Sequence, residues 1–264
     1  MSDLTNTFSD IANAIRYKEG SVNTYTPLEM AGAINNIVSG WTLSVTQSNI
    51  YQDFRTSFNS PVEFSSSVLD YEDMFNGFVS FNQHINNINC FSAENMFRDC
   101  YNFNQKININ LVDNGPSLPS ASNIFRNCYN FNSSVNMFTF VNNTSVSYAF
   151  ANCTNFNIPL KFGAKFKNFQ HLLDGAINFG QTVNFTSTRT NITAQTDVLG
   201  MFANTGTGDS AKRKYIYFNN RVIDTDIFLG NSPGNSLVAD YITWTSTGTG
   251  QWENDYYNIV IRSL

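Results

Sequence analysis

Apolar residues in the first 40 positions recur at helical spacing in two stretches, which a short run of small polar residues separates. Thr26 and Pro27 open the second stretch, as expected for the capped first turn of a helix. The pattern predicts a hairpin of two amphipathic helices over residues 1–40. Helices this short are marginal alone, so their apolar stripe should dock on a partner or on other copies, or fold back onto the rest of the chain. The stripe consists of Leu4, Phe8, Ile11, Ile15, Met30, Ile34 and Ile37.

A repeat occupies residues 71–205. Each unit opens with an apolar pair, and the steps from 74 to 96, 124, 149, 172 and 201 are 22, 28, 25, 23 and 29 residues, in or near the range of leucine-rich repeats. In five of the six units a phenylalanine follows seven residues after the start, and in three units a cysteine follows four residues after the start. These positions form the predicted structural ladder: Phe81, Phe103, Phe131, Phe156, Phe179, Cys100, Cys128 and Cys153.

Apolar residues alternate with polar ones near the end of each unit, from Ile85 in the first to Val183 and Phe185 in the fifth. Each unit therefore predicts a helical turn, a tight turn at Asn-Phe-Asn and a short strand, and the stacked units should share one parallel sheet. The expected fold is an α/β solenoid of the leucine-rich-repeat type. Residues 41–70 should cap one end, and residues 206–264, with strands expected at 215–218, 241–245 and 256–261, should form a β-rich cap at the other.

Polar residues between the buried strand positions should form one exposed strip. They are Asn86, Lys106, Asn108, Ser134, Asn136, Lys161 and Asn184. The strip is either a solvated sheet face, with amide side chains bonded along the ladder, or a recognition surface for a cell-wall sugar or a neighbouring protein.

The composition limits the kinds of molecule that the chain can bind. Only 13% of residues are charged, 15% are aromatic, and the net charge is -5, which argues against nucleic acid. The basic run 212–214 suggests a solvated loop. No apolar stretch is long enough to span a bilayer, and residues 1–20 lack the apolar core of a signal peptide, so we expect no membrane insertion and no general secretion.

Candidate chemistry is sparse. We expect the cysteines to be buried free thiols, and His84 and His171 to be surface or turn residues, because no Cys-x-x-Cys pair supports zinc. Residues 206–212 lack the ending of a phosphate loop. Carboxylates that would suit a glycosidase pair or calcium have no evident partners; they are Asp70, Glu72, Asp73, Asp224 and Asp226. We therefore expect no enzymatic activity, no cofactor and no metal.

Two segments resemble known families. The run of Leu4, Thr5, residues 10–16, Lys18 and residues 25–31 is similar to the N-terminal segment of many phage tail and baseplate-associated proteins, which implies attachment to a virion. The units NMFRDCYNFNQKININ and NIFRNCYNFNSSVNMF resemble BspA-like leucine-rich repeats, which occur in bacterial surface proteins and some phage tail proteins.

The resemblances together predict a non-enzymatic tail, baseplate or fibre protein of a virion, assembled in the host cytoplasm and exposed after lysis. Residues 1–40 would attach it to other virion proteins, it would form homo-oligomers within the particle, and its solenoid would display a surface for particle architecture or for a host glycan or protein. The alternatives are a secreted bacterial adhesin of the BspA-like type and a cell-wall hydrolase.

Overall fold

The computed structural model describes residues 43–45, 56, 58–64, 69–113, 118–139, 143–163, 165–185, 192–205, 213–218, 245–248, 251–254 and 259–263. The chain divides into two compact units, Met1–Leu43 and Ser44–Leu264. The hairpin predicted for residues 1–40 lies outside the described residues and stays a prediction. Everything below concerns the second unit.

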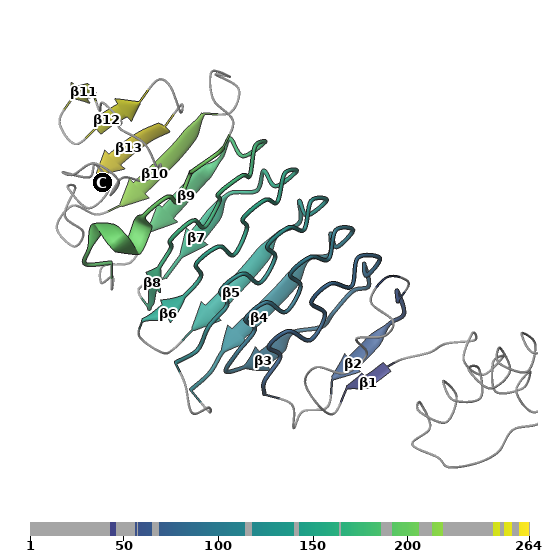
Figure 1. The fold of residues 1–264 in the computed structure, drawn as a ribbon. Coiled ribbons are helices and arrows are strands. Elements are labelled where there is room, and N and C mark those ends of the chain that lie inside the picture. The colour runs from purple at the N-terminus through teal and green to yellow at the C-terminus, as the bar shows by residue number, and fades with distance from the viewer. Residues whose placement is uncertain are drawn as a thin grey trace, which may run out of the picture. The chain divides into compact units, whose positions relative to one another are not determined.

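Short parallel strands dominate this unit (Figure 1). One sheet contains β3 (Ile88–Cys90), β4 (Ile107–Leu111) and β5 (Val135–Thr139), and a second has the order β11, β12, β13, β10, β9, β7. The strands of the second sheet are β7 (Leu160–Phe162), β9 (Thr182–Phe185), β10 (Lys214–Phe218), β11 (Thr245–Gly248), β12 (Gln251–Asn254) and β13 (Ile259–Ser263). Two further pairs are β1 (Leu43–Val45) with β2 (Val62–Phe64) and β6 (Thr144–Ser145) with β8 (Phe166–Asn168).

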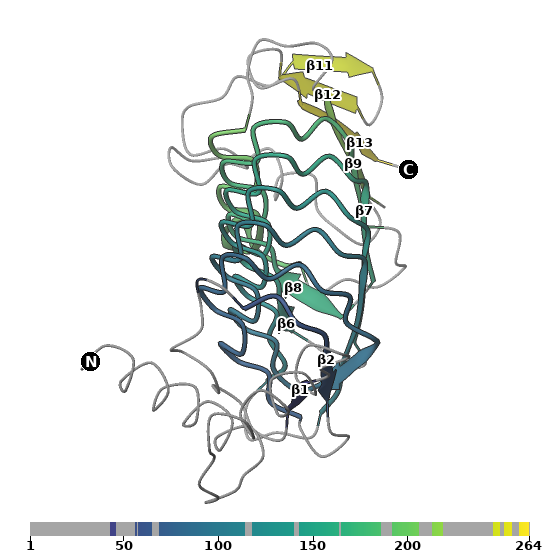
Figure 2. The same cartoon turned by 90° about the vertical axis from the view of Figure 1, so that its right-hand side faces the viewer.

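The described residues between 69 and 205 form a solenoid-like stack of rungs, one for each sequence repeat (Figure 1). In Figure 2 the strands lie along one side of the stack and the successive turns along the opposite side. A third line of parallel bridges joins Asp70 to Ser92, Ser92 to Ser120 and Ser120 to Ser145, and the β6–β8 pair continues it. The described strands β10 to β13 fall within the segment expected to be a β-rich cap, and β10 pairs in parallel with β9, so the sheet continues beyond residue 205.

The helical turns expected in each rung are absent from the described rungs, and that prediction was wrong. The single described helix is the 3-10 segment η2 (Gln195–Val198), and none of the described helices is long and apolar enough to cross a bilayer. The turns are instead consecutive β-turns. In the rung that starts at Met96, for example, the Cys100 amide donates to the Phe97 carbonyl at 3.1 Å, while the Phe97 amide donates to Ile124 of the next rung at 2.9 Å. Because alternate amides bond to the next rung, they cannot bond within a helix.

Two positions in every turn have a positive φ angle, which explains why the turns do not continue into helices. The first precedes the apolar pair and the second follows three residues after its start. They are occupied by Asp73, Asn95, Asn123, Tyr148, His171, Gly200, Gly77, Asp99, Asn127, Asn152, Gly175 and Asn204. Glycine, asparagine and aspartate adopt this left-handed conformation at the least cost. Gly200 has a second constraint, because a Cβ there would lie 2.5 Å from Cε1 of His171.

Phenylalanine rings fill the stack in two parallel columns. Successive rings of the predicted ladder from Phe81 to Phe179 lie 5.8–6.0 Å apart and within 11° of parallel. A second column, formed by the second residue of each unit, runs beside it: Phe75, Phe97, Phe125 and Phe150 follow one another at 5.6 Å. Ring pairs between the columns lie as close as 4.3 Å, as for Phe97 and Phe103. All of these rings are buried, so each rung is covered by its neighbours.

Replacing Phe131 with alanine should therefore lower the free energy of unfolding by about 3–5 kcal/mol, because the ring is fully buried and loses partners in two rungs. Denaturant unfolding followed by circular dichroism measures this. The control is Tyr129→Ala, which removes a ring that is 41% exposed and should cost about 1 kcal/mol or less. Equal losses in the two variants would contradict the packing described.

Candidate functional site

The strand face carries the polar residues that the sequence placed in one strip. Asn108 and Asn136 face each other across β4 and β5, and Lys161 faces Asn184 across β7 and β9. Lys106 and Ser134 are exposed just before β4 and β5. One member is offset: β3 pairs Ile88 with Ile109, so Asn87 opposes Asn108, and Asn86, which is also exposed, precedes it by one position. The first rung has one more residue before its strand than the alignment allowed, which shifts every later side chain by one position.

Amide side chains form a polarised ladder along this face. Nδ2 of Asn108 donates to Oδ1 of Asn87 at 2.7 Å, and Nδ2 of Asn136 donates to Oδ1 of Asn108 at 2.7 Å. Each amide donates toward the N-terminal rung and accepts from the C-terminal one. The ladder stops at Asn136, because Lys161 occupies the corresponding position in the next rung and makes no hydrogen bond or ion pair with another described residue. Oδ1 of Asn136 is therefore an acceptor at an open end.

The parallel sheet is interrupted at the same place. β5 is the last strand of one sheet and β7 is the last strand of the other, so the single sheet expected from the sequence is in fact two. Pro159 directly precedes β7 and has no amide hydrogen to donate to a neighbouring strand. The side chains of Val135 and Met137 are consequently half-buried, whereas Ile107 and Ile109 at the matching positions of β4 are 1% and 0% exposed.

The two rungs are nevertheless bonded to each other on both sides of this interruption, before and after strands β5 and β7. On the turn side, the Phe125 amide donates to Ala149 at 2.9 Å and the Asn127 amide to Ala151 at 2.8 Å. The Phe131 and Phe156 rings stack at 5.8 Å across the same two rungs. Along the line of parallel bridges that runs between the strands and the turns, β6 pairs with β8. The opening is therefore a local slot in a stack whose rungs remain in register.

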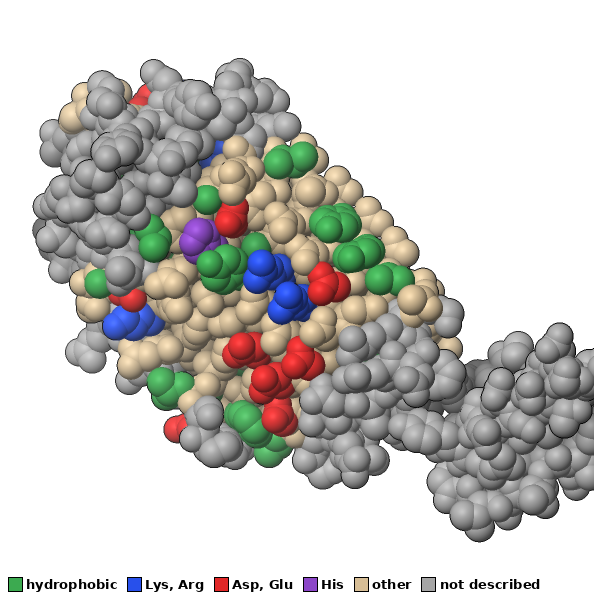
Figure 3. All heavy atoms as spheres, viewed as in Figure 1, with side chains coloured by type: hydrophobic (Ala, Val, Ile, Leu, Met, Phe, Trp, Pro, Cys, Tyr) green, Lys and Arg blue, Asp and Glu red, His purple; other side chains and the backbone are tan. Residues whose placement is uncertain are grey.

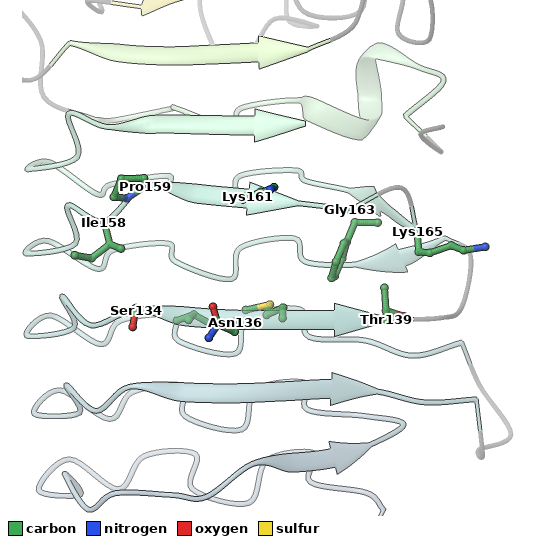
Figure 4. Close-up of a pocket in the computed structure, with 11 residues that line it drawn as sticks. Ser134, Asn136, Thr139, Ile158, Pro159, Lys161, Gly163 and Lys165 are labelled. Carbon is green, nitrogen blue, oxygen red and sulfur yellow. The ribbon is translucent and has the colours of Figure 1, made fainter. Parts of the chain in front are cut away.

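This slot forms a cleft of about 470 Å³. Figure 4 shows Ser134, Asn136 and Thr139 along β5 and Pro159 and Lys161 along the β7 side, with the open space between the two strands. Three of the seven residues predicted for the exposed strip line it, namely Ser134, Asn136 and Lys161, and the other four do not. The complete lining is Ser134, Val135, Asn136, Met137, Thr139, Ile158, Pro159, Lys161, Gly163, Lys165 and Phe166.

The lining suits binding rather than acid-base chemistry. Among the described residues that line the cleft are two lysines and no aspartate, glutamate, histidine, cysteine or tyrosine. Its apolar lining comes from Val135 and Met137 of β5 and from Ile158, Pro159 and Phe166 on either side of β7, while the hydroxyl, amide and ammonium groups of Ser134, Asn136 and Lys161 are exposed. Clefts with an apolar wall and a few directed polar groups are typical of ligand sites.

The other candidate groups lie elsewhere. His84 is exposed, and His171 stacks on Tyr148 at 4.7 Å with its Nδ1 3.0 Å from Oδ2 of Asp174. Figure 3 shows a largely uncharged face, on which acidic side chains gather in one group. Burial, and then the carboxylates of Glu94, Asp70 and Asp73, raise the pKa of Glu72.

The described residues contain no group of His, Cys, Asp and Glu side chains that would hold a metal ion. Asp224, Asp226 and residues 206–212 lie outside the described residues.

The four cysteines are free and buried. Three of them donate from Sγ to a carbonyl of the preceding rung at 2.9 Å: Cys100 to Phe75, Cys128 to Phe97 and Cys153 to Phe125. Burial raises the pKa of all four thiols, that of Cys90 to about 12, and so suppresses the reactive thiolate.

We expect none of the four thiols to react with an aromatic disulfide reagent at about pH 8 in the folded protein, because the thiolate is unpopulated and access is blocked. All four should react after denaturation in guanidinium chloride. Stopped-flow absorbance gives the number of thiols modified in each state. Rapid modification of a thiol in the folded protein would contradict the buried placement.

The sequence carries one signal of the cleft. Pro159 and Lys161 stand where the neighbouring rungs carry Lys106, Ser134 and asparagine. Their meaning depends on strand pairing, which the repeat pattern does not report.

Comparison with known proteins places the chain in a family. The model of the family described as "Mycoplasma protein of unknown function, DUF285" matches residues 24–115 and again residues 114–215. The chain belongs to this family. It is a family associated with BspA-like repeat proteins, and the two matches meet between β4 and β5. No curated protein and no solved structure matches the chain.

Proposed function

We propose that this protein is a non-enzymatic attachment and recognition scaffold of a phage virion, with its stack built as BspA-like leucine-rich repeats. In this proposal residues 1–40 dock on other virion proteins, and the polar strand face contacts the host surface through the cleft between β5 and β7. The observation that carries the recognition role is the cleft itself: a slot with a polar rim on an exposed face of a stack held rigidly on both sides.

The stack suits such a role for a physical reason. Its rungs are joined by amide hydrogen bonds and stacked rings from Phe75 to Phe179, so the two walls of the cleft are held apart before a ligand arrives. A preformed site loses less conformational entropy on binding than one that must first be ordered. The N-terminal resemblance to phage tail and baseplate-associated proteins supports the virion as the place of action.

A bacterial surface adhesin of the BspA-like type is the second candidate. The description of the matching family refers to a bacterial genus, and the same stack would serve an adhesin equally well. The two candidates share the recognition face and differ in where the chain resides.

The location can be tested by inducing the parent genome and banding the released particles in a density gradient. We expect peptides of this chain to co-migrate with the major tail protein and to be absent from the cell-envelope fraction of uninduced cells. Quantitative mass spectrometry of both fractions gives the answer. Enrichment in the envelope of uninduced cells would replace the virion proposal with the adhesin.

The recognition face can be tested with a matched pair of substitutions in the full-length protein. Ser134 and Lys106 occupy equivalent exposed positions in neighbouring rungs, but only Ser134 lines the cleft. Ser134→Trp should weaken binding of the labelled protein to host cells by about tenfold or more, because the indole fills the cleft, and Lys106→Trp should leave it unchanged. Flow cytometry measures cell binding, and circular dichroism checks that both variants are folded. Equal binding by the two variants would remove the cleft from the recognition surface.

A further inference from the structure

The cleft between β5 and β7 has the features of a vacant strand position. Among the described strands, β5 pairs with β4 alone and β7 pairs with β9 alone, so the cleft-side edges of both face no described partner strand. Unpaired strand edges accept extended peptides through main-chain hydrogen bonds. Two such edges that face one cleft would hold a peptide from both sides.

The size of the cleft agrees with one short strand. A strand residue rises about 3.3 Å, is separated from its neighbours by about 4.8 Å and, with its side chains, spans about 10 Å, which gives a volume on the order of 160 Å³. The cleft of about 470 Å³ therefore accommodates about three residues. β7, which forms one wall, is three residues long.

The rim specifies the side chain that would point outward. On one side, Oδ1 of the exposed Asn136 accepts no hydrogen bond from a described residue and is open to a donor. On the other side, Lys161 is a donor that needs an acceptor. A primary amide offers both: its Nδ2 would donate to Asn136, and its oxygen would accept from Lys161. A carboxylate would face the Asn136 oxygen with an acceptor, and an ammonium would face Lys161 with a like charge.

The wall specifies the residues on either side of that amide. Side chains alternate between the two faces of a strand, so the neighbours of an outward amide point inward. They would meet the half-buried Val135 and Met137 of β5 and the ring of Phe166, all of which line the cleft. Apolar side chains are therefore required at both positions.

We propose that the cleft binds an extended peptide segment with an apolar–Asn–apolar pattern as an additional strand between β5 and β7. The inserted strand would join the two sheets into one and continue the amide ladder from Asn136 to Lys161. This inference rests on the recognition role proposed above and names the class of partner as a protein segment rather than a sugar. The β4 sequence of this chain, Ile107–Leu111, has the required pattern and shows that such a strand fits the neighbouring rungs.

The test uses the full-length protein and a fluorescent peptide with the sequence of residues 106–111, Lys-Ile-Asn-Ile-Asn-Leu. We expect saturable binding by fluorescence anisotropy, together with slower hydrogen exchange of β5 amides in the complex. A peptide with both asparagines replaced by aspartate should bind about tenfold more weakly or not at all, because it loses the donor to Asn136. A peptide methylated on its backbone nitrogens should not bind, because it cannot pair with the strand edges.

Two variants locate the site. Lys161→Met keeps the length of the side chain and removes its donor, so it should weaken peptide binding by about tenfold. Lys106→Met, on the same face and outside the cleft, should have no effect. Absence of peptide binding to the folded wild-type protein, equal binding of the asparagine and aspartate peptides, or equal effects of the two variants would overturn the inference.

The outcome is distinguishable from a failure of the proposed function. If Ser134→Trp abolishes cell binding while the peptide does not bind, and a neutral oligosaccharide mixture from host walls competes for the cells, the recognition role stands and the peptide class is wrong. If neither the cells nor the peptide is bound, both proposals fail.

Discussion

Each rung of the stack is too thin to enclose its own phenylalanines, so its rings pack on each other and on the rings of the neighbouring rungs. The offset contacts between Phe97, Phe103 and their counterparts in the neighbouring rungs recur from one end of the described stack to the other. The inter-rung amide bonds, such as that from Phe97 to Ile124, keep those rings in register. Stability is therefore shared between neighbours, and the positions of the surface side chains follow from the same register.

The left-handed turn positions account for many of the asparagines in this sequence. Two residues per turn must adopt positive φ, and asparagine or aspartate at these sites also bonds across rungs, as Asn127 does to Asp99 at 2.6 Å. A second use of asparagine occurs at the tight turns, where Oδ1 of Asn104 accepts the amide of Asn132 at 2.8 Å. Many of the asparagines therefore have a structural role, and among the described residues a single one, Asn136, lines the cleft. Tyr148 and His171 are the exceptions at positive φ; they stack on each other, and Arg126 lies over Tyr148 at 5.1 Å.

The cleft exists because neighbouring rungs stay paired on two sides of the stack and lose their pairing on the side of the strands. The turn side and the β6–β8 side remain bonded between the rungs of Phe125 and Phe150, while β5 and β7 do not pair. An opening of this kind is rigid, because closing it would require the joined flanks to move. Rigidity and a directed rim at Asn136 and Lys161 are the properties that a recognition site needs and that a uniform sheet face lacks.

The sequence by itself determined the period of the stack, the burial of Phe103 and Cys128, and the alternation that makes Ile107 and Ile109 face the core, because these follow from spacing along the chain. It did not determine the turn conformation, since apolar spacing at Met96 and Cys100 suits a helix and a chain of β-turns alike until the amides find partners in the next rung. Nor did it determine the pairing of Asn108 with Asn87 or the break between β5 and β7. Those depend on contacts between residues more than twenty positions apart, where one additional residue or one proline changes which groups meet, and only the tertiary structure decides them.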